Sequence, residues 1–128
     1  MSNTGPNNAF DSPLPAALRD RREFQRIHVK WRAAIQSAGT SANVTVMEIS
    51  DVGFGFIGDI AYKIGALLSF ELNMPDPVDG AQRHLVAGQV EVMSSVLTRE
   101  GFRAGVILKT INPTHLELLK AWVKVRTT

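Results

Sequence analysis

The sequence contains no cysteine, which excludes a disulfide framework, a thiolate zinc site and a cysteine nucleophile. It has no apolar run approaching the ~18 residues that a membrane span needs. Its first residues lack the basic start and apolar stretch of a secretory signal. We therefore expect a cytoplasmic protein that does not insert into a membrane.

Aromatic residues are also scarce, at 7% of the chain, and most fall on the apolar phase of an expected strand or helix. A small barrel that binds RNA or single-stranded DNA would instead need aromatics interleaved with basic residues on an exposed face. With 128 residues, 45% of them hydrophobic and 20% charged, the chain has the composition of one globular domain with a modest core.

The net charge is only +2, but the positive charge is concentrated in one segment. Residues 19–32 carry a charge of +4 because two acidic residues, Asp20 and Glu23, stand against six basic ones. A surface for duplex DNA is usually basic over a whole face. This short segment instead indicates a local anion site. The six basic residues are Arg19, Arg21, Arg22, Arg26, Lys30 and Arg32.

Hydrophobic alternation predicts six strands followed by one helix. In residues 26–36 five apolar side chains alternate with polar or small ones, which is typical of a half-buried strand. Asn112 before Pro113 is a good start for a helix, and apolar residues recur at helical spacing from there to the end. The expected strands are 26–36, 44–49, 54–57, 66–72, 85–97 and 102–109, with a turn at 37–40 and a loop at 73–80.

This order of elements predicts a mainly β fold, a small six-stranded antiparallel β-barrel with a C-terminal α-helix. Residues 1–18 are rich in Asn, Pro, Ser and Ala and have no apolar period, so we expect a flexible tail there. The domain is then expected to span residues 19–128, including the arginine-rich segment.

Two motifs at a characteristic distance resemble a known family. Arg22-x-x-x-Arg26 is followed by Glu48-x-Ser50-x-x-Gly53, an acidic-x-Ser-x-x-Gly turn at the end of an expected strand. Together they resemble the signature of the PilZ domain, a β-barrel module that binds cyclic di-GMP. The similarity runs from about Arg19 to Val125. It implies a six-stranded barrel with an arginine arm before the first strand and a helix after the last.

The resemblance also implies a function, that of a non-enzymatic receptor for cyclic di-GMP. Arg21, Arg22 and Arg26 are the expected contacts to phosphate and guanine, since a guanidinium fork suits both. A carboxylate at Glu48 can accept from guanine, and the Ser50 hydroxyl can donate or accept beside it. Gly53 permits a positive φ angle and close approach of a ligand.

Glu48 departs from the family pattern, which has Asp or Asn at that position. Its side chain is one methylene longer, so the carboxylate oxygens lie roughly 1.5 Å further from the backbone. It could serve as a guanine acceptor, or it could pair with an arginine of the arm and hold it closed. The first favours a receptor that reorders its arm and signals to a protein partner in motility, biofilm or pilus regulation. The second favours a degenerate domain that acts only as a protein-interaction adaptor.

Other functional readings receive little support from the sequence. Residues 53–58 fit the G-x-G-x-x-G pattern, but Phe54 and Phe56 alternate as in a strand and no β-α-β unit surrounds them. His28, His84 and His115 have no metal-ligand spacing. Ser50 has no nucleophile elbow, so no catalysis is expected. We expect no metal and no cofactor, only the ligand cyclic di-GMP.

Overall fold

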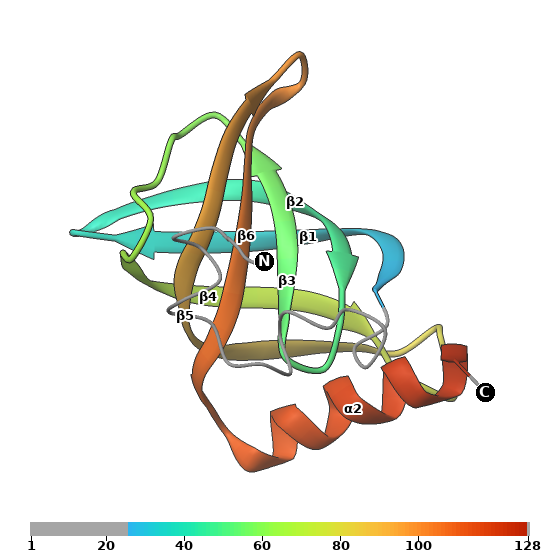
Figure 1. The fold of residues 1–128 in the computed structure, drawn as a ribbon. Coiled ribbons are helices and arrows are strands. Elements are labelled where there is room, and N and C mark those ends of the chain that lie inside the picture. The colour runs from blue at the N-terminus through green and yellow to red at the C-terminus, as the bar shows by residue number, and fades with distance from the viewer. Residues whose placement is uncertain (1–25, 128) are drawn as a thin grey trace, which may run out of the picture.

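Six antiparallel strands close into a barrel in the computed structural model, which describes residues 26–127 (Figure 1). The strands lie in the order β1-β2-β3-β6-β5-β4 around the barrel. The predicted tail, 1–18, and the arginines Arg19, Arg21 and Arg22 lie outside the described residues. The strands are β1 (Ile27–Ser37), β2 (Thr40–Ile49), β3 (Gly53–Gly58), β4 (Leu67–Pro75), β5 (Arg83–Thr98) and β6 (Gly101–Ile111).

The predicted fold class is confirmed, and each predicted strand and the helix is present. The first hairpin turns tightly at Ala38 and Gly39, both with positive φ, which suits a two-residue turn between twisted strands. The predicted loop at 73–80 was wrong for residues 73–75, because β4 continues to Pro75 opposite Arg83. Proline is tolerated there since it ends the strand.

The barrel core is filled by the inward phase of every strand. Trp31, Val46, Phe56, Phe70 and Val90 are among its buried side chains. Aromatic rings from different strands meet at distances typical of edge-to-face packing, for example 5.2 Å between the centroids of Phe54 and Phe70. The polar phase therefore forms an outer surface, on which charged side chains of adjacent strands can meet.

One open end of the barrel is covered by α2 (Pro113–Thr127) (Figure 1). The helix starts as predicted, because the side chain of Asn112 accepts a hydrogen bond from the Thr114 N–H at 2.8 Å. Leu119, Trp122 and Val123 are buried against the strands. Trp122 packs edge-on against Trp31 of β1, with ring centroids 4.7 Å apart. Both tryptophans are core residues, as the sequence predicted.

Candidate functional site

The turn between β2 and β3 is folded by Ser50. The Ser50 N–H donates to the Gly53 carbonyl at 2.9 Å, and its hydroxyl donates to the same oxygen at 3.4 Å. The Val52 N–H donates to the Ser50 hydroxyl at 3.2 Å. With 7% of its surface exposed, Ser50 is the one buried polar residue among those described. Its hydroxyl therefore fixes the shape of the turn from within.

Gly53 is required by the neighbouring strand. A Cβ at this position would run into the backbone of β6 at Val106 and Ile107. Among the described glycines, positive φ occurs at Gly39, Gly65 and Gly101, so Gly53 does not use the positive φ that a glycine permits. The glycine therefore lets the first residue of β3 lie in close contact with the backbone of β6. This close packing keeps the β2–β3 turn near the outer face of the sheet.

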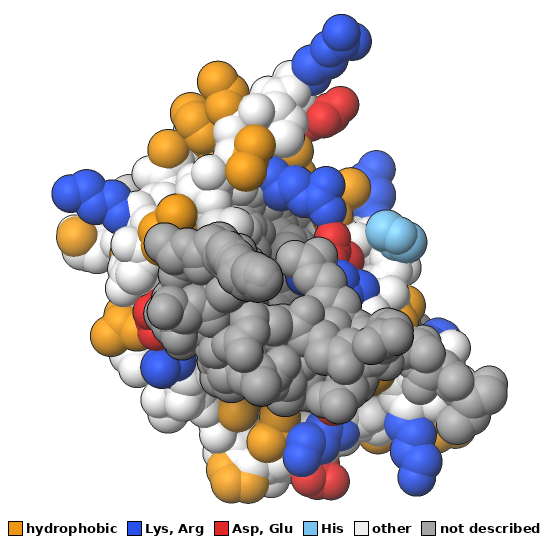
Figure 2. Space-filling view, in the orientation of Figure 1, with side chains coloured by type: hydrophobic (Ala, Val, Ile, Leu, Met, Phe, Trp, Pro, Cys, Tyr) orange, Lys and Arg blue, Asp and Glu red, His pale blue; other side chains and the backbone are white. Residues whose placement is uncertain are grey.

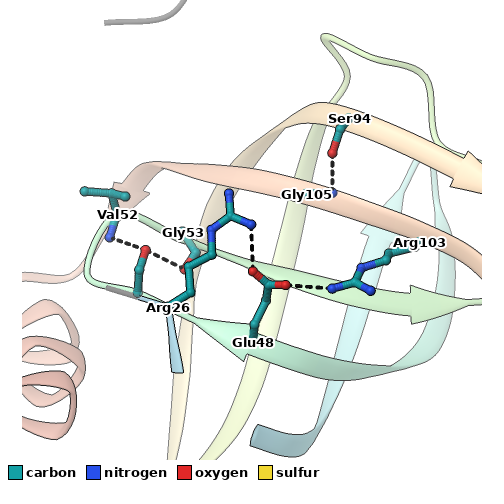
Figure 3. A network of polar contacts seen from close by, with 8 residues as sticks. Arg26, Glu48, Val52, Gly53, Ser94, Arg103 and Gly105 are labelled. Atoms are coloured by element: carbon teal, nitrogen blue, oxygen red, sulfur yellow. Dashed lines mark hydrogen bonds and ion pairs between the residues drawn. The ribbon is translucent and has the colours of Figure 1, made fainter. Parts of the chain in front are cut away.

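Glu48 lies on that outer face, at an irregular point of the sheet. The register between β2 and β3 shifts between Val46 and Glu48, and Glu48 then stands opposite Gly55. A Cβ at Gly55 would lie only 3.0 Å from the Glu48 Cγ. Because Gly55 has no side chain, Glu48 can lie across β3 and direct its carboxylate toward β6 (Figure 3).

Two arginines that are far apart in the sequence meet at this carboxylate (Figure 3). Arg26 Nη1 lies 2.8 Å from Glu48 Oε1, and Arg103 Nη2 of β6 lies 2.6 Å from Glu48 Oε2. The Glu48 side chain is 12% exposed, whereas those of both arginines are 49% exposed. Two cations against one anion leave this cluster with a net charge of +1. Each half-exposed guanidinium keeps N–H groups beyond the one it gives to Glu48.

Two glycines lie side by side next to these arginines, and the side chains of Glu48 and Ser94 lie against them. Gly55 pairs with Gly105 of β6, and Gly105 is followed by Ser94 of β5. A Cβ at Gly105 would lie 2.6 Å from the Ser94 hydroxyl oxygen, which accepts from the Gly105 N–H at 3.2 Å. Glu48, Gly55, Gly105 and Ser94 therefore form one row across four strands, in which the Glu48 and Ser94 side chains lie against the two glycines. Because neither glycine carries a side chain, a flat ligand can come closer to the sheet at this row than over larger residues.

The structure brings together only some of the predicted site residues. Arg26 and Glu48 are in direct contact, and Ser50 and Gly53 form the adjoining turn. Arg21 and Arg22 lie outside the described residues. Arg103 was missed as a site residue, although its alternation with Phe102 and Ala104 already assigned it to the polar face of its strand. Contact with Glu48 depends on the register of the barrel, which the sequence motif does not contain.

The remaining candidate sites have structural explanations. Residues 53–58 form strand β3, as expected, and open no helix. His84 Nε2 contacts Asp76 Oδ1 at 2.7 Å, and His115 Nδ1 accepts from the Ala87 N–H at 3.2 Å. Within residues 26–127, no three side chains of His, Asp or Glu gather as a metal site would require. The same part of the chain has no helix with the length and apolar character to cross a membrane.

Comparison with known proteins identifies the fold. No protein-family model matches the sequence, and no curated protein matches it. Among solved structures, the Bacillus subtilis inhibitor of motility MotI/DgrA superposes with a TM-score of 0.72 at 14% identity. That alignment covers 84% of this chain and 51% of the other, so the chain spans about half the length of that protein.

A second solved structure is the PilZ domain of YcgR from Escherichia coli, determined with c-di-GMP. It superposes with a TM-score of 0.61 at 15% identity, covering 82% of this chain and 90% of that domain. The order of strands, the closed barrel and the C-terminal helix agree with the resemblance found in the two sequence motifs. This chain has the PilZ-like fold.

Proposed function

We propose that this protein is a receptor for cyclic di-GMP, which binds on the outer face of β2, β3 and β6. The observation that carries the proposal is the convergence of Arg26 and Arg103 on Glu48, beside the row in which Gly55 pairs with Gly105. The solved YcgR domain was determined with this ligand, and its fold is shared by the present chain. The arginine motif, Arg22-x-x-x-Arg26, precedes the turn motif, Glu48-x-Ser50-x-x-Gly53, which is the order that such a site requires.

The chemistry of the cluster suits the ligand. Each phosphate of a cyclic dinucleotide is an anion that a guanidinium fork can hold by two hydrogen bonds, and the same fork can reach O6 and N7 of guanine. Glu48 uses one lone pair of each oxygen on an arginine. Its remaining acceptor capacity is free for the N1–H and amino group of a guanine.

Glu48 therefore has two roles in this proposal. It fixes the directions of Arg26 and Arg103, and it accepts from a guanine base that the ligand places beside it. Ser50 and Gly53 act by shaping the turn that borders the ligand. Arg21 and Arg22 supply further contacts from the segment that precedes β1, so the binding domain begins near residue 19.

The output of such a receptor is a protein contact. Neutralising the clustered cations with a dianionic ligand reorders the arginine arm, and the rearranged surface is then presented to a protein partner. MotI/DgrA is described as an inhibitor of motility, and control of motility is the process we propose for this chain. The proposal involves no catalytic step, and it assigns the protein to the cytoplasm of a bacterial cell.

Isothermal titration calorimetry with two cyclic dinucleotides tests this proposal. Cyclic di-AMP carries the same two phosphates but lacks the guanine O6 and the N1–H, so it should bind at least tenfold more weakly than cyclic di-GMP. Arg26→Ala and Arg103→Ala should each weaken cyclic di-GMP binding about tenfold to a hundredfold, because a hydrogen bond to a charged group contributes about 1.5–3 kcal/mol.

Arg99→Ala is the matched control, since Arg99 is an exposed arginine in the β5–β6 turn, away from Glu48. Circular dichroism of each variant checks that the barrel is intact. Equal loss of binding in all three variants, or equal binding of the two dinucleotides, would contradict a guanine-specific site at Glu48.

A further inference from the structure

The hairpin of β5 and β6 extends beyond the rest of the barrel and leaves one edge of β5 uncovered (Figure 1). β4 pairs with β5 only between Arg83 and Glu91, and the next contact is made by Val92 with Gly65 and Ala66 of the β3–β4 loop. β6 continues to pair with β5 as far as Thr98. Within the part of the chain that the structure describes, residues 94–98 therefore have a strand on one side only.

Residues 94–98 of this edge lack charge and proline, two features by which proteins protect exposed strands, although the segment is short and follows a register shift between Val92 and Ser94. Its sequence, Ser-Ser-Val-Leu-Thr, contains no charge and no proline, and the register with β6 is regular from Ser94 onward. Val96 is 58% exposed and Leu97 is 69% exposed, although both are residues that a protein usually covers. An edge of this kind is a template for the addition of another strand.

We propose that this edge pairs with the same edge of a second copy of the chain, in an antiparallel two-fold dimer. Side chains that stand opposite each other in an antiparallel pair point to the same face of the sheet. The two-fold axis that relates the copies must therefore pass through a residue that faces its own counterpart, because an axis between two residues would set side chains of opposite faces against each other. The free segment of five residues has Val96 at its centre, so Val96 of one copy stands opposite Val96 of the other.

The rest of the pairing is self-complementary in this register. Ser94 stands opposite Thr98 of the second copy, a pair of hydroxyls that stabilises neighbouring strands, and Ser95 stands opposite Leu97. No like charges face each other along the paired segment. Such an isologous arrangement pairs the same five residues of both copies with each other. It leaves no free edge at this segment for a third copy.

Charge and apolar surface at the ends of the segment favour the same partner. Beyond Thr98 the hairpin turn of each copy carries Arg99 and Glu100, and in this register Arg99 is directed toward Met93 and Glu100 toward Val92 of the other copy. Val92 is held by the β3–β4 loop, which carries the exposed Lys63. Figure 2 shows apolar side chains gathered at this end of the molecule, over that loop and the hairpin. The exposed Ile64 lies in the same loop and would be partly covered by the second copy.

Cross-linking tests the register directly, because the native chain has no cysteine. Val96→Cys should form a covalent dimer under mild oxidation, since opposed residues of paired strands lie within reach of a disulfide. Val78→Cys is the control, as Val78 is 91% exposed in the loop after β4 and stands on no proposed interface. We expect at least tenfold more covalent dimer from Val96→Cys. Equal yields in the two variants would overturn the proposal.

Sedimentation equilibrium tests the association without any cysteine. An edge of five residues is small, so the dimer is weak and should be sought between about 10 µM and 1 mM protein. The wild-type mass should rise from 14.0 kDa toward twice that value. Val96→Lys should abolish this rise, because the pairing would set two lysines directly opposite each other on one face, where like charges repel, whereas Val78→Lys should leave it unchanged.

The charged ends give a second readout. Glu100→Lys should weaken the dimer at low salt, and the combination Lys63→Glu with Glu100→Lys should restore it. A wild-type protein that stays monomeric throughout the concentration range, or a Val96→Lys variant that dimerises like the wild type, would overturn the proposal. This inference does not depend on cyclic di-GMP, so its failure would leave the proposed ligand site untouched.

Discussion

Replacing Glu48 with glutamine separates the two roles that a carboxylate can have between two arginines. The substitution keeps the size of the side chain and one acceptor oxygen, but it removes the charge that Arg26 and Arg103 share at 2.8 and 2.6 Å. If Glu48 orients the arginines and accepts from guanine, its neutralisation weakens binding. If the carboxylate instead competes with the ligand for the arginines, the same change strengthens binding.

The magnitude follows from the exposure of the partners. Both arginines are half-exposed, so each ion pair is screened by water and contributes at most about 0.2–1 kcal/mol to stability. Glu48→Gln should therefore lower the unfolding free energy by about 1 kcal/mol, which corresponds to a decrease in Tm of roughly 4 °C for a domain of this size. The loss of charge-assisted acceptance from the base should raise the Kd for cyclic di-GMP about tenfold or more.

Glu91→Gln is the matched control for both measurements. Glu91 is also a partly buried glutamate on a barrel strand, and it pairs with Lys109 at 3.4 Å, outside the proposed site. Calorimetric titration gives Kd and differential scanning calorimetry gives Tm. We expect Glu91→Gln to change Tm slightly and to leave Kd as in the wild type. Tighter binding by Glu48→Gln would refute the role that we assign to Glu48, and would favour a carboxylate that holds the arm closed.

Two further predictions concern the scaffold around the site. Gly53→Ala should destabilise the fold by about 1–3 kcal/mol in urea unfolding, because its methyl group overlaps the β6 backbone, whereas Gly80→Ala, which meets open space, should change stability by less than about 0.5 kcal/mol. Hydrogen bonds from the Asp79 N–H, the His84 side chain and the Val78 N–H lower the pKa of Asp76 from 3.8 to about 2. This contribution to stability is present above pH 4 and is lost as the pH falls toward 2, so Asp76→Asn should flatten the acid limb of the stability profile; an unchanged profile would contradict it.

The succession of six strands and one helix along the chain could be predicted from the sequence because each element has a clear local signal. Alternation in residues 26–36 and 102–109 identifies two strands with their inward faces, and Asn112 before Pro113 identifies the helix start. The end of β4 was missed because proline is a poor strand residue in general, yet Pro75 occupies the last position of the strand. Local patterns therefore determined the elements, and tertiary pairing adjusted their ends.

The site was only half predictable, for the same reason. Arg26 and Glu48 stand in recognisable motifs, and their ion pair was one of two roles considered for Glu48. Arg103 is 55 residues further along the chain from Glu48 and reaches it only because β3, with Gly55 at the crossing point, lies between β2 and β6. Gly55 likewise leaves room for the Glu48 side chain only because the two residues stand opposite each other. This pairing depends on the register of β2 and β3, which a single sequence does not specify.

Titration of the wild-type protein with cyclic di-GMP, followed by the Arg26→Ala/Arg103→Ala double variant, tests the central claim most directly. The account predicts saturable heat for the wild type at concentrations up to tens of micromolar, and none for a double variant that is still folded. A wild type that gives no saturable heat, or a double variant that binds equally well, would contradict a cyclic di-GMP site at the Glu48 cluster.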